Sequence, residues 1–264
     1  MTSDRIVVIG LDGARGEALR EAATPNIDAL VTEGAVTYAA RTVMPSISFP
    51  AWGSMFHGVG PEKHQLSPET PCTEDDPWPS FFKAARQQRP GLTCASFSCW
   101  NMINKHMIED SCDCRFASMP DEQLVDLAVP YIQRHMPDML FVQLDFIDHA
   151  GHAHGYQTPE YLEQITKTDR HVGQLVNALR SAGLFETTLL VVLSDHGGVE
   201  KMHGSDDPDC MNIFWACRGH GIAMGVELDS DLNIMDTAAV VMRALGLDAP
   251  EGWDAKVPEG LFTA

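Results

Sequence analysis

The chain has 264 residues, a mass of 29.0 kDa and a formal charge of −19 at neutral pH. A surface with this charge repels long nucleic acids and anionic membranes, which argues against both as partners. A small anionic substrate would need a locally cationic site. With only 18 basic residues, the simplest way to build such a site is a bound metal ion.

The length, the lack of apolar runs and the cysteine spacing predict the domain number and the cellular compartment of the protein. This length favours one α/β domain over residues 1–264. The chain contains neither a run of about 18 apolar residues nor a secretory leader, so we expect no membrane span and a cytoplasmic location. Its seven cysteines have no regular spacing, as in a reducing compartment, and Cys112 with Cys114 is only weak evidence for a metal or redox pair. A homo-oligomer is compatible with this composition.

The first junction between a strand and an acid lies near the N-terminus. Residues 5–9 are an apolar run that predicts a buried strand, and Asp12 follows it between glycines. Asp12 could ligate a metal ion or merely cap the next helix. Residues 24–34 predict a short helix, since Thr-Pro opens it and a glycine ends it, and residues 35–43 alternate as in a strand.

The second informative stretch surrounds Ser48. This serine precedes Phe-Pro and a segment compatible with a helix from Ala51 onward. Free backbone N–H groups and the helix dipole favour an anion at a helix N-terminus, so Ser48 stands where an alkoxide nucleophile would be stabilised. Taken alone, the pattern favours a serine that only caps the helix.

The next part of the chain is the least regular. Residues 59–117 form the irregular excursion expected within the domain, and their first part, residues 59–79, predicts a long surface loop. Inside the excursion we expect a helix over residues 81–88 and a strand over residues 92–97, with residues 99–117 irregular.

The third junction is the richest in potential ligands. A helix over residues 120–135 and a buried strand over residues 139–144 lead into it. A chain that turns through Gly151 could bring Asp148 and His152 onto one ion. Three further side chains there are expected to be outer or solvated groups: Asp145, His149 and His154.

The last junction follows the most apolar strand of the chain. Residues 158–182 predict a long helix, and residues 189–193 predict a strand buried on both faces, which ends before Asp195 and His196. These two side chains could supply an oxygen and a nitrogen to a metal ion, or belong to a turn closed by glycine. The remaining expected elements are a strand and a helix, over residues 211–217 and 235–245.

Strands alternate with helices along the chain, which predicts an α/β fold with a mostly parallel central sheet between two layers of helices. Ligands of open α/β sheets bind outside the carboxyl ends of the strands. We therefore expect the acidic junctions to meet at one edge of the sheet.

The motifs together resemble the alkaline phosphatase superfamily, in particular its type I phosphodiesterase/nucleotide pyrophosphatase branch. Six stretches carry the resemblance, in the order of that family: residues 9–13, 24–28, 48–50, 58–64, 148–152 and 194–197. The resemblance implies an alkaline-phosphatase-like fold, and the short chain implies that its usual cap is reduced.

The resemblance also implies two divalent cations a few ångströms apart, Zn²⁺ or alternatively Mn²⁺. One would be held by Asp12, Asp195, His196 and the bridging Ser48 hydroxyl, and the other by Asp148, His152 and a third histidine. Family members attack phosphorus with the Ser or Thr, form a covalent enzyme intermediate and release it with an activated water. Three carboxylates and an alkoxide would balance two divalent cations, which leaves a neutral site that can accept an anion.

Departures from the family pattern leave two roles open. The branch usually has Thr as nucleophile with an Asn two residues beyond the Phe, whereas this chain has Ser48 and Ala51. An Asn donor to the phosphoryl oxygen would have to come from elsewhere, and Asn101 is a candidate. The last histidine ligand usually lies near the C-terminus, and His203 is the substitute here, with His220 as the alternative.

The expected activity is hydrolysis of a phosphodiester or nucleotide pyrophosphate bond in a small phosphorylated substrate. A phosphonate hydrolase of the phosphonoacetate type or a phosphomonoesterase would use the same ligands. A sulfatase is disfavoured because the stretch after Ser48 lacks the Arg of the Cys/Ser-x-Pro-x-Arg motif, and a phosphoglycerate mutase because that family carries a large inserted domain. A metal-binding module without turnover would keep the acids and histidines but need no nucleophile.

Overall fold

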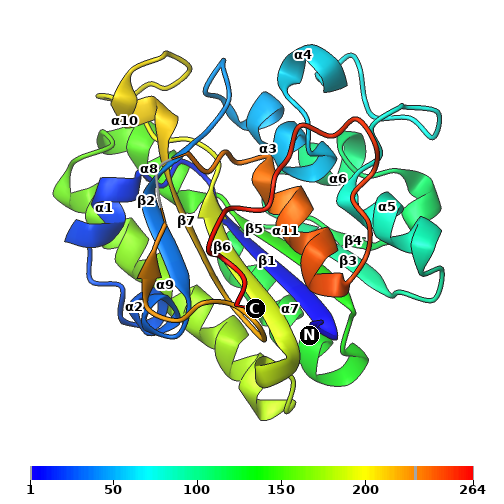
Figure 1. The fold of residues 1–264 in the computed structure, drawn as a ribbon. Helices are drawn as coiled ribbons and strands as arrows, with labels where there is room; N and C mark the ends of the chain where they lie inside the picture. The colour runs from blue at the N-terminus through cyan, green and yellow to red at the C-terminus, as the bar shows by residue number, and fades with distance from the viewer. Residues whose placement is uncertain (1, 229–230, 264) are drawn as a thin grey trace.

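The computed structural model describes residues 2–228 and 231–263, which form one mixed sheet between two layers of helices (Figure 1). The strands are β1 (Arg5–Leu11), β2 (Ala35–Arg41), β3 (Cys94–Ser98), β4 (Arg115–Ala117), β5 (Met139–Leu144), β6 (Thr188–Ser194), β7 (Asn212–Arg218) and β8 (Val226–Glu227). Their order is β4-β3-β5-β1-β6-β7-β2-β8, and β7 is antiparallel to both of its neighbours while the other pairs are parallel. The predicted, mostly parallel α/β fold is confirmed.

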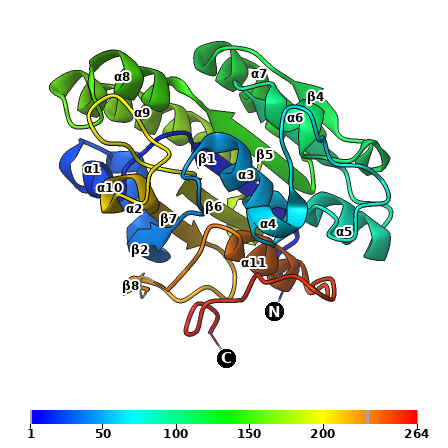
Figure 2. The ribbon, with the colours of Figure 1, turned by 90° about the horizontal axis from the view of Figure 1, so that it is seen from above.

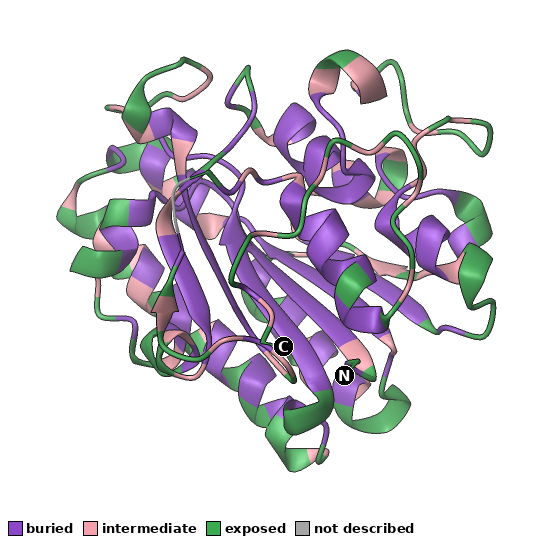
Figure 3. Ribbon diagram, in the orientation of Figure 1, coloured by how far each residue is buried: buried purple, intermediate pink, exposed green. Residues whose placement is uncertain are grey.

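Alternate side chains of the central strands enter two separate hydrophobic layers. In β1, Ile6 and Val8 belong to one layer, and Val7 and Ile9 belong to the other, as the two-residue period of a strand requires. Every residue of β6 is buried, and Figure 3 shows the same for most of the central strands. Burial on both faces explains why these strands are continuous apolar runs.

Helices cover both faces of the sheet (Figure 2). One face carries α3 (Ser48–His57), α5 (Phe81–Gln88), α6 (Met102–His106) and α11 (Asp236–Leu245), with α4 (Pro61–His64) against α3. The other carries α1 (Gly16–Glu21), α2 (Pro25–Thr32), α7 (Asp121–His135), α8 (Phe146–His154) and α9 (Pro159–Ser181). Within the described ranges, no helix combines the length and the apolar character needed to cross a membrane.

The short elements are where the structure departs from the sequence prediction. Residues 99–117 were expected to be irregular, but they contain α6, a 3-10 turn at Asp110–Cys112 and the edge strand β4, which pairs with β3. The helices α1 and α10 (Pro208–Met211) and the edge strand β8 were not predicted either, nor was α4, which lies within the surface loop expected over residues 59–79. Segments of two to six residues are too short to show a hydrophobic period, so their form depends on the neighbours with which they pair.

Candidate active site

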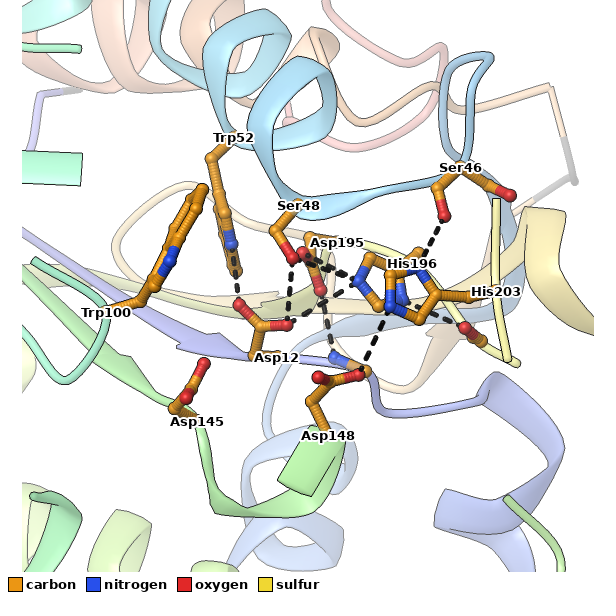
Figure 4. A network of polar contacts seen from close by, with 12 residues as sticks. Asp12, Ser46, Ser48, Trp52, Trp100, Asp145, Asp148, Asp195, His196 and His203 are labelled. Carbon is orange, nitrogen blue, oxygen red and sulfur yellow. Dashed lines mark hydrogen bonds and ion pairs between the residues drawn. The ribbon is translucent and has the colours of Figure 1, made fainter. Parts of the chain in front are cut away.

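Three strands end side by side at one edge of the sheet, and each is followed by an aspartate. In the register of the sheet, Leu11 of β1 lies between Leu144 of β5 and Ser194 of β6. The next residues along the three segments are Asp12, Asp145 and Asp195. The expected meeting of acidic junctions is therefore present, and Figure 4 shows Asp12, Asp195 and also Asp148 around one centre, with Asp145 to one side.

Ser48 faces this centre from the first turn of α3. Its Oγ lies 3.4 Å from Asp12 Oδ1 and 3.2 Å from His196 Nε2. The residue that occupies the N-cap position is Ile47, so Ser48 does not have the position of a capping serine. Among the described residues, the backbone N–H groups of Ser48 and Phe49 donate to no backbone carbonyl, which leaves two donors beside the hydroxyl.

A second group of side chains comes from α8 and from the loop after β6. Asp148 and His152 lie four residues apart on α8, and Asp148 Oδ2 is 3.3 Å from His152 Nε2. His203 brings its Nε2 to 3.1 Å from that of His152 and 3.9 Å from Asp148 Oδ1. The ring of His203 also stacks on that of His196, with centroids 3.8 Å apart, so the two groups are adjacent.

The turn expected at Gly151 is wrong, because this residue lies inside a helix. Residues i and i+4 share a helix face, so α8 delivers Asp148 and His152 together without any reversal of the chain. The glycine is needed for close packing instead. A Cβ at Gly151 would lie 2.5 Å from the ring of Tyr156.

The hydrogen bonds of the histidines show which ring nitrogen is free. His152, His196 and His203 direct Nδ1 at the backbone oxygens of Lys201, Gly197 and Ser46, at 2.8, 2.9 and 3.1 Å. Only a protonated nitrogen can donate to a carbonyl oxygen, so in its neutral form each ring carries its proton on Nδ1 and a lone pair on Nε2. In His152 and His203 these lone pairs face each other across 3.1 Å, an arrangement that a cation bound by both nitrogens would stabilise.

Two of the carboxylates have one oxygen fixed by the protein and the other directed into the cluster. Asp195 Oδ1 accepts from the Gly13 N–H at 3.0 Å, and Tyr156 donates its hydroxyl to Asp148 Oδ1. Asp195 Oδ2 is buried and accepts no hydrogen bond from the described residues. Buried oxygens without a partner are rare and costly, and a bound cation would satisfy this one.

Asp12 also has one oxygen fixed by the protein, through two donors that the sequence analysis did not identify. Its Oδ2 accepts from Trp52 Nε1 and from Gln143 Nε2, both at 2.9 Å, while Oδ1 faces Ser48. A sequence signal existed for both donors. Trp52 lies four residues after Ser48 and so shares its helix face, and Gln143 is a polar residue inside an otherwise apolar strand. Tyr156, the donor to Asp148, had no such signal.

Burial and mutual repulsion dominate the electrostatics of the cluster. Burial raises the pKa of Asp12 well above its ordinary value, and neighbouring carboxylates, first that of Asp195, raise it further. Burial likewise raises the pKa of Asp195 to about 8. Burial lowers the pKa of both His196 and His203, so these rings are neutral near pH 7. Crowded carboxyl groups beside neutral imidazoles are an arrangement that binding of a divalent cation would relieve.

The donor atoms form two overlapping sets, in each of which all atoms lie within 4.8 Å of one another. One set is Asp148, His152 and His203, and the other is Asp12, Asp148 and His196. Carboxylate oxygens and imidazole nitrogens are ligands that Zn²⁺ and related divalent ions accept. With the partnerless oxygen of Asp195 and the lone pairs of the histidines, the side chains fit a site for divalent cations.

The alternative third histidine, His220, and the candidate Asn donor, Asn101, lie elsewhere in the structure. Strand β7 ends at Arg218 beside the start of β6, so His220 lies beyond the edge of the sheet opposite the cluster. Asn101 is exposed at the start of α6, and its amide makes no hydrogen bond to the cluster within the described part of the chain. His203, rather than His220, accompanies Asp148 and His152.

The three side chains expected to be outer groups behave differently from one another. Asp145 Oδ2 pairs with His149 Nε2 at 2.9 Å, and Asp145 Oδ1 accepts from Gln143, so neither oxygen is free. The hydrogen bond that His149 donates to Asp145 is the largest cause of the raised pKa of His149. His154 is exposed at the end of α8.

Comparisons with known proteins show the family and the fold to which the chain is similar. A family model described as type I phosphodiesterase / nucleotide pyrophosphatase matches residues 6–244. An uncharacterized pyrophosphatase/phosphodiesterase of Schizosaccharomyces pombe is 25% identical over 220 residues, which cover 73% of this chain and 44% of that protein. Ectonucleotide pyrophosphatase/phosphodiesterase family member 1 of Mus musculus is 24% identical over 214 residues, which cover 72% of this chain and 24% of that protein. The chain thus spans less than half of the length of these relatives.

A solved structure shares the fold over nearly the whole chain. Murine ectonucleotide pyrophosphatase / phosphodiesterase 5, as an inactive variant in complex with AMP, superposes with a TM-score of 0.74 at 14% identity. The superposition covers 93% of this chain and 96% of that one. Because the family model covers most of the sequence, the chain belongs to the type I phosphodiesterase / nucleotide pyrophosphatase family.

Proposed function

We propose that this chain is a metal-dependent phosphohydrolase that cleaves phosphodiester or pyrophosphate bonds in small nucleotides, with Ser48 as the nucleophile. The observation that carries the proposal is the position of Ser48 Oγ, at hydrogen-bond distance from His196 and 3.4 Å from Asp12, on the first turn of a helix. Membership of the family and the names of the relatives support this class of substrate.

The two groups of side chains divide into two proposed cation sites. Asp12, Asp195, His196 and Ser48 would hold one ion, and Asp148, His152 and His203 would hold the other. Zn²⁺ is the first choice, because both groups combine imidazole and carboxylate, and Mn²⁺ is the alternative. When bound, such ions would supply Lewis acidity that lowers the pKa of a coordinated hydroxyl and neutralises phosphoryl oxygens.

The residues of the chain position the substrate and carry the transferred group. Ser48 Oγ attacks phosphorus, so an oxygen–phosphorus bond forms as the bond to the leaving alcohol or phosphate breaks. The free N–H groups of Ser48 and Phe49 are available to a phosphoryl oxygen, a role for which the family pattern supplies an Asn that is Ala51 here. Water then cleaves the ester on Ser48, which restores the hydroxyl and releases the second product.

Replacement of Ser48 by Ala tests the role of the nucleophile. We expect hydrolysis of bis-p-nitrophenyl phosphate to fall by about three orders of magnitude or more, because the residual activity of such variants comes only from substrate binding and electrostatics. Metal content, measured by elemental analysis, should remain close to that of the wild type, because most of the proposed ligands are unchanged.

Ser54→Ala is the matched control, because Ser54 lies on the same helix and bonds to His64 rather than to the cluster. It should retain wild-type turnover. Wild-type activity of Ser48→Ala would remove Ser48 from the mechanism. A wild-type protein that binds metal but hydrolyses none of the substrates would instead indicate a binding module.

Removal of divalent ions tests the proposed sites themselves. Three buried or nearly buried carboxyl groups repel one another without a cation, so chelation should lower the melting temperature, and added Zn²⁺ or Mn²⁺ should restore it. The measurement is thermal unfolding of the chelated and reconstituted protein. An unchanged melting curve, with no metal found by elemental analysis, would contradict the two-site proposal.

A substrate panel on metal-reconstituted protein separates the remaining activities. Diester, pyrophosphate, monoester, phosphonate and sulfate substrates should be compared at equal concentration. We expect the highest kcat/KM for diester or pyrophosphate bonds. A preference for phosphonate or monoester would keep the site and change the assigned reaction.

A further inference from the structure

The side-chain amide of Gln143 lies between two carboxylates next to the proposed cation sites. Gln143 is fully buried near the end of β5, and its Nε2 donates to Asp12 Oδ2 at 2.9 Å and to Asp145 Oδ1 at 2.8 Å. Its Oε1 accepts from the backbone N–H of Trp100 at 2.9 Å. Because only the oxygen of the amide can accept from Trp100, the amide orientation is fixed and both of its hydrogens point at carboxylates.

This arrangement decides which oxygen of Asp12 remains free. Asp12 Oδ2 accepts from both Gln143 and Trp52, whereas Oδ1 lies 3.4 Å from Ser48 Oγ and 3.6 Å from His196 Nε2. Figure 4 shows the same division, with Trp52 above one oxygen of Asp12 and Ser48 above the other. A carboxylate held in this way offers one oxygen to an ion, in a fixed direction.

The same amide also keeps a neighbouring acid out of the cluster. Asp145 follows β5 beside Asp12, but its oxygens are bonded to Gln143 and to His149. Its backbone N–H donates to the buried carboxyl of Asp121 at 2.9 Å, which fixes the main chain at this point. Asp145 therefore adds negative charge near Asp12 without presenting a free oxygen.

We propose that Gln143 is a positioning residue which, with Trp52, fixes Asp12 as a one-oxygen ligand and holds Asp145 away from the cation. The inference rests on the proposed function only in requiring that the cluster binds divalent ions. It predicts an asymmetric effect, because Gln143 bonds to Asp12, whereas among the described residues it has no hydrogen bond to Asp148, His152 or His203.

The test is metal titration of the metal-stripped, full-length protein carrying Gln143→Leu, which removes the amide and keeps a similar volume. With Zn²⁺ against a chromophoric competitor, one of two binding events should weaken about 10–100-fold and the other should stay at its wild-type affinity. Activity at limiting Zn²⁺ should fall, and excess Zn²⁺ should restore kcat toward the wild-type value. A residue with only a structural role would not give this rescue by metal.

Two further variants keep the test decisive. Trp52→Phe removes the indole donor but keeps an aromatic ring, and it should weaken the same binding event, which provides the answer if Gln143→Leu does not fold. Ser96→Ala, on the neighbouring strand β3, is the control, because it loses a partly buried hydrogen bond to Asn104 without touching Asp12. It should lower the melting temperature and leave both affinities unchanged.

The outcomes separate this inference from the proposed function. Wild-type affinities in Gln143→Leu and Trp52→Phe, or an equal loss at both binding events, would overturn the positioning role. A wild-type protein that binds two ions and hydrolyses no phosphorus ester would defeat the proposed function and leave the positioning role standing.

Discussion

At the scale of single residues, the cluster combines carboxyl groups that cannot all be ionised unless a cation balances their charge. The pKa values of Asp12 and Asp195 are raised mainly by burial, and those of His196 and His203 are lowered by the same cause. In the metal-free protein the carboxyl groups therefore resist losing their protons, and the imidazoles resist gaining them. Divalent cations compete with those protons, which makes metal affinity rise with pH.

The metal-free protein should lose stability as the pH rises from about 6.5 to about 8. The pKa of Asp195 is about 8 in the folded chain and roughly 3.9 when unfolded, so the unfolded state binds fewer protons in this range. The stability due to its protonated form is present at low pH and is lost as the pH rises through the folded pKa. His196 and His203 have lowered pKa values, so below about pH 6.5 they make stability rise with pH. This opposite effect sets the lower end of the pH range.

The measurement is thermal unfolding in chelator at several pH values between about 6.5 and 8.5. Asp195→Asn should show a weaker decline than the wild type, because the amide does not ionise. A wild-type melting temperature that rises over this window would contradict the assignment of Asp195 as a strained, buried acid.

At the scale of elements, one family motif, residues 24–28, lies away from the site, and its long-range contacts explain why it is present. Asp169, buried on α9, accepts from the backbone N–H groups of Asn26 and Ile27 at 3.1 and 2.8 Å, and from Asn26 Nδ2 at 2.7 Å. A Cβ at Gly173 of the same helix would lie 2.4 Å from the Asn26 amide, so α2 and α9 approach closely. The motif of residues 24–28 thus joins two helices.

Asp169→Ala should destabilise the protein without changing the site. It leaves two backbone donors of α2 without their acceptor, which costs about 2–4 kcal/mol of unfolding free energy. Denaturant unfolding measures this loss, and Zn²⁺ affinity should not change. Glu163→Ala is the control on the same helix, because its exposed ion pair with Lys167 is screened by solvent and should contribute little to stability. Equal effects of the two variants would contradict the capping role of Asp169.

The sequence predicted the acidic junctions because each follows a strand whose residues are apolar on both faces. Parallel strands in one sheet must bring their carboxyl ends to one edge, so Asp12 and Asp195 could be placed together without coordinates. The helical geometry of Asp148 and His152 could not be predicted, because Gly151 suggested a turn. Tyr156, which donates to Asp148, stands in no sequence pattern that would reveal this role. The role of Gln143 was missed for a similar reason, since it depends on the pairing of β5 with β1.

At the scale of the whole molecule, the charge of −19 sets the conditions under which an anionic substrate can approach. The average field repels nucleotides and phosphate esters, and only the immediate surroundings of bound cations would attract them. Binding at the site and approach to it therefore respond differently to salt. Contacts within the site are short and poorly screened, whereas repulsion from the surface acts over several ångströms and is screened by added ions.

We therefore expect kcat/KM to rise several-fold as the ionic strength increases from about 10 to about 150 mM, because the Debye length falls from about 30 to about 8 Å and the repulsion is screened. The value of kcat should change little. The effect should be larger for a multiply charged pyrophosphate substrate than for singly charged bis-p-nitrophenyl phosphate, compared by steady-state kinetics at saturating metal. A decline of kcat/KM with salt for both substrates would mean that a local positive potential around the site outweighs the acidic surface, even before the substrate reaches Ser48.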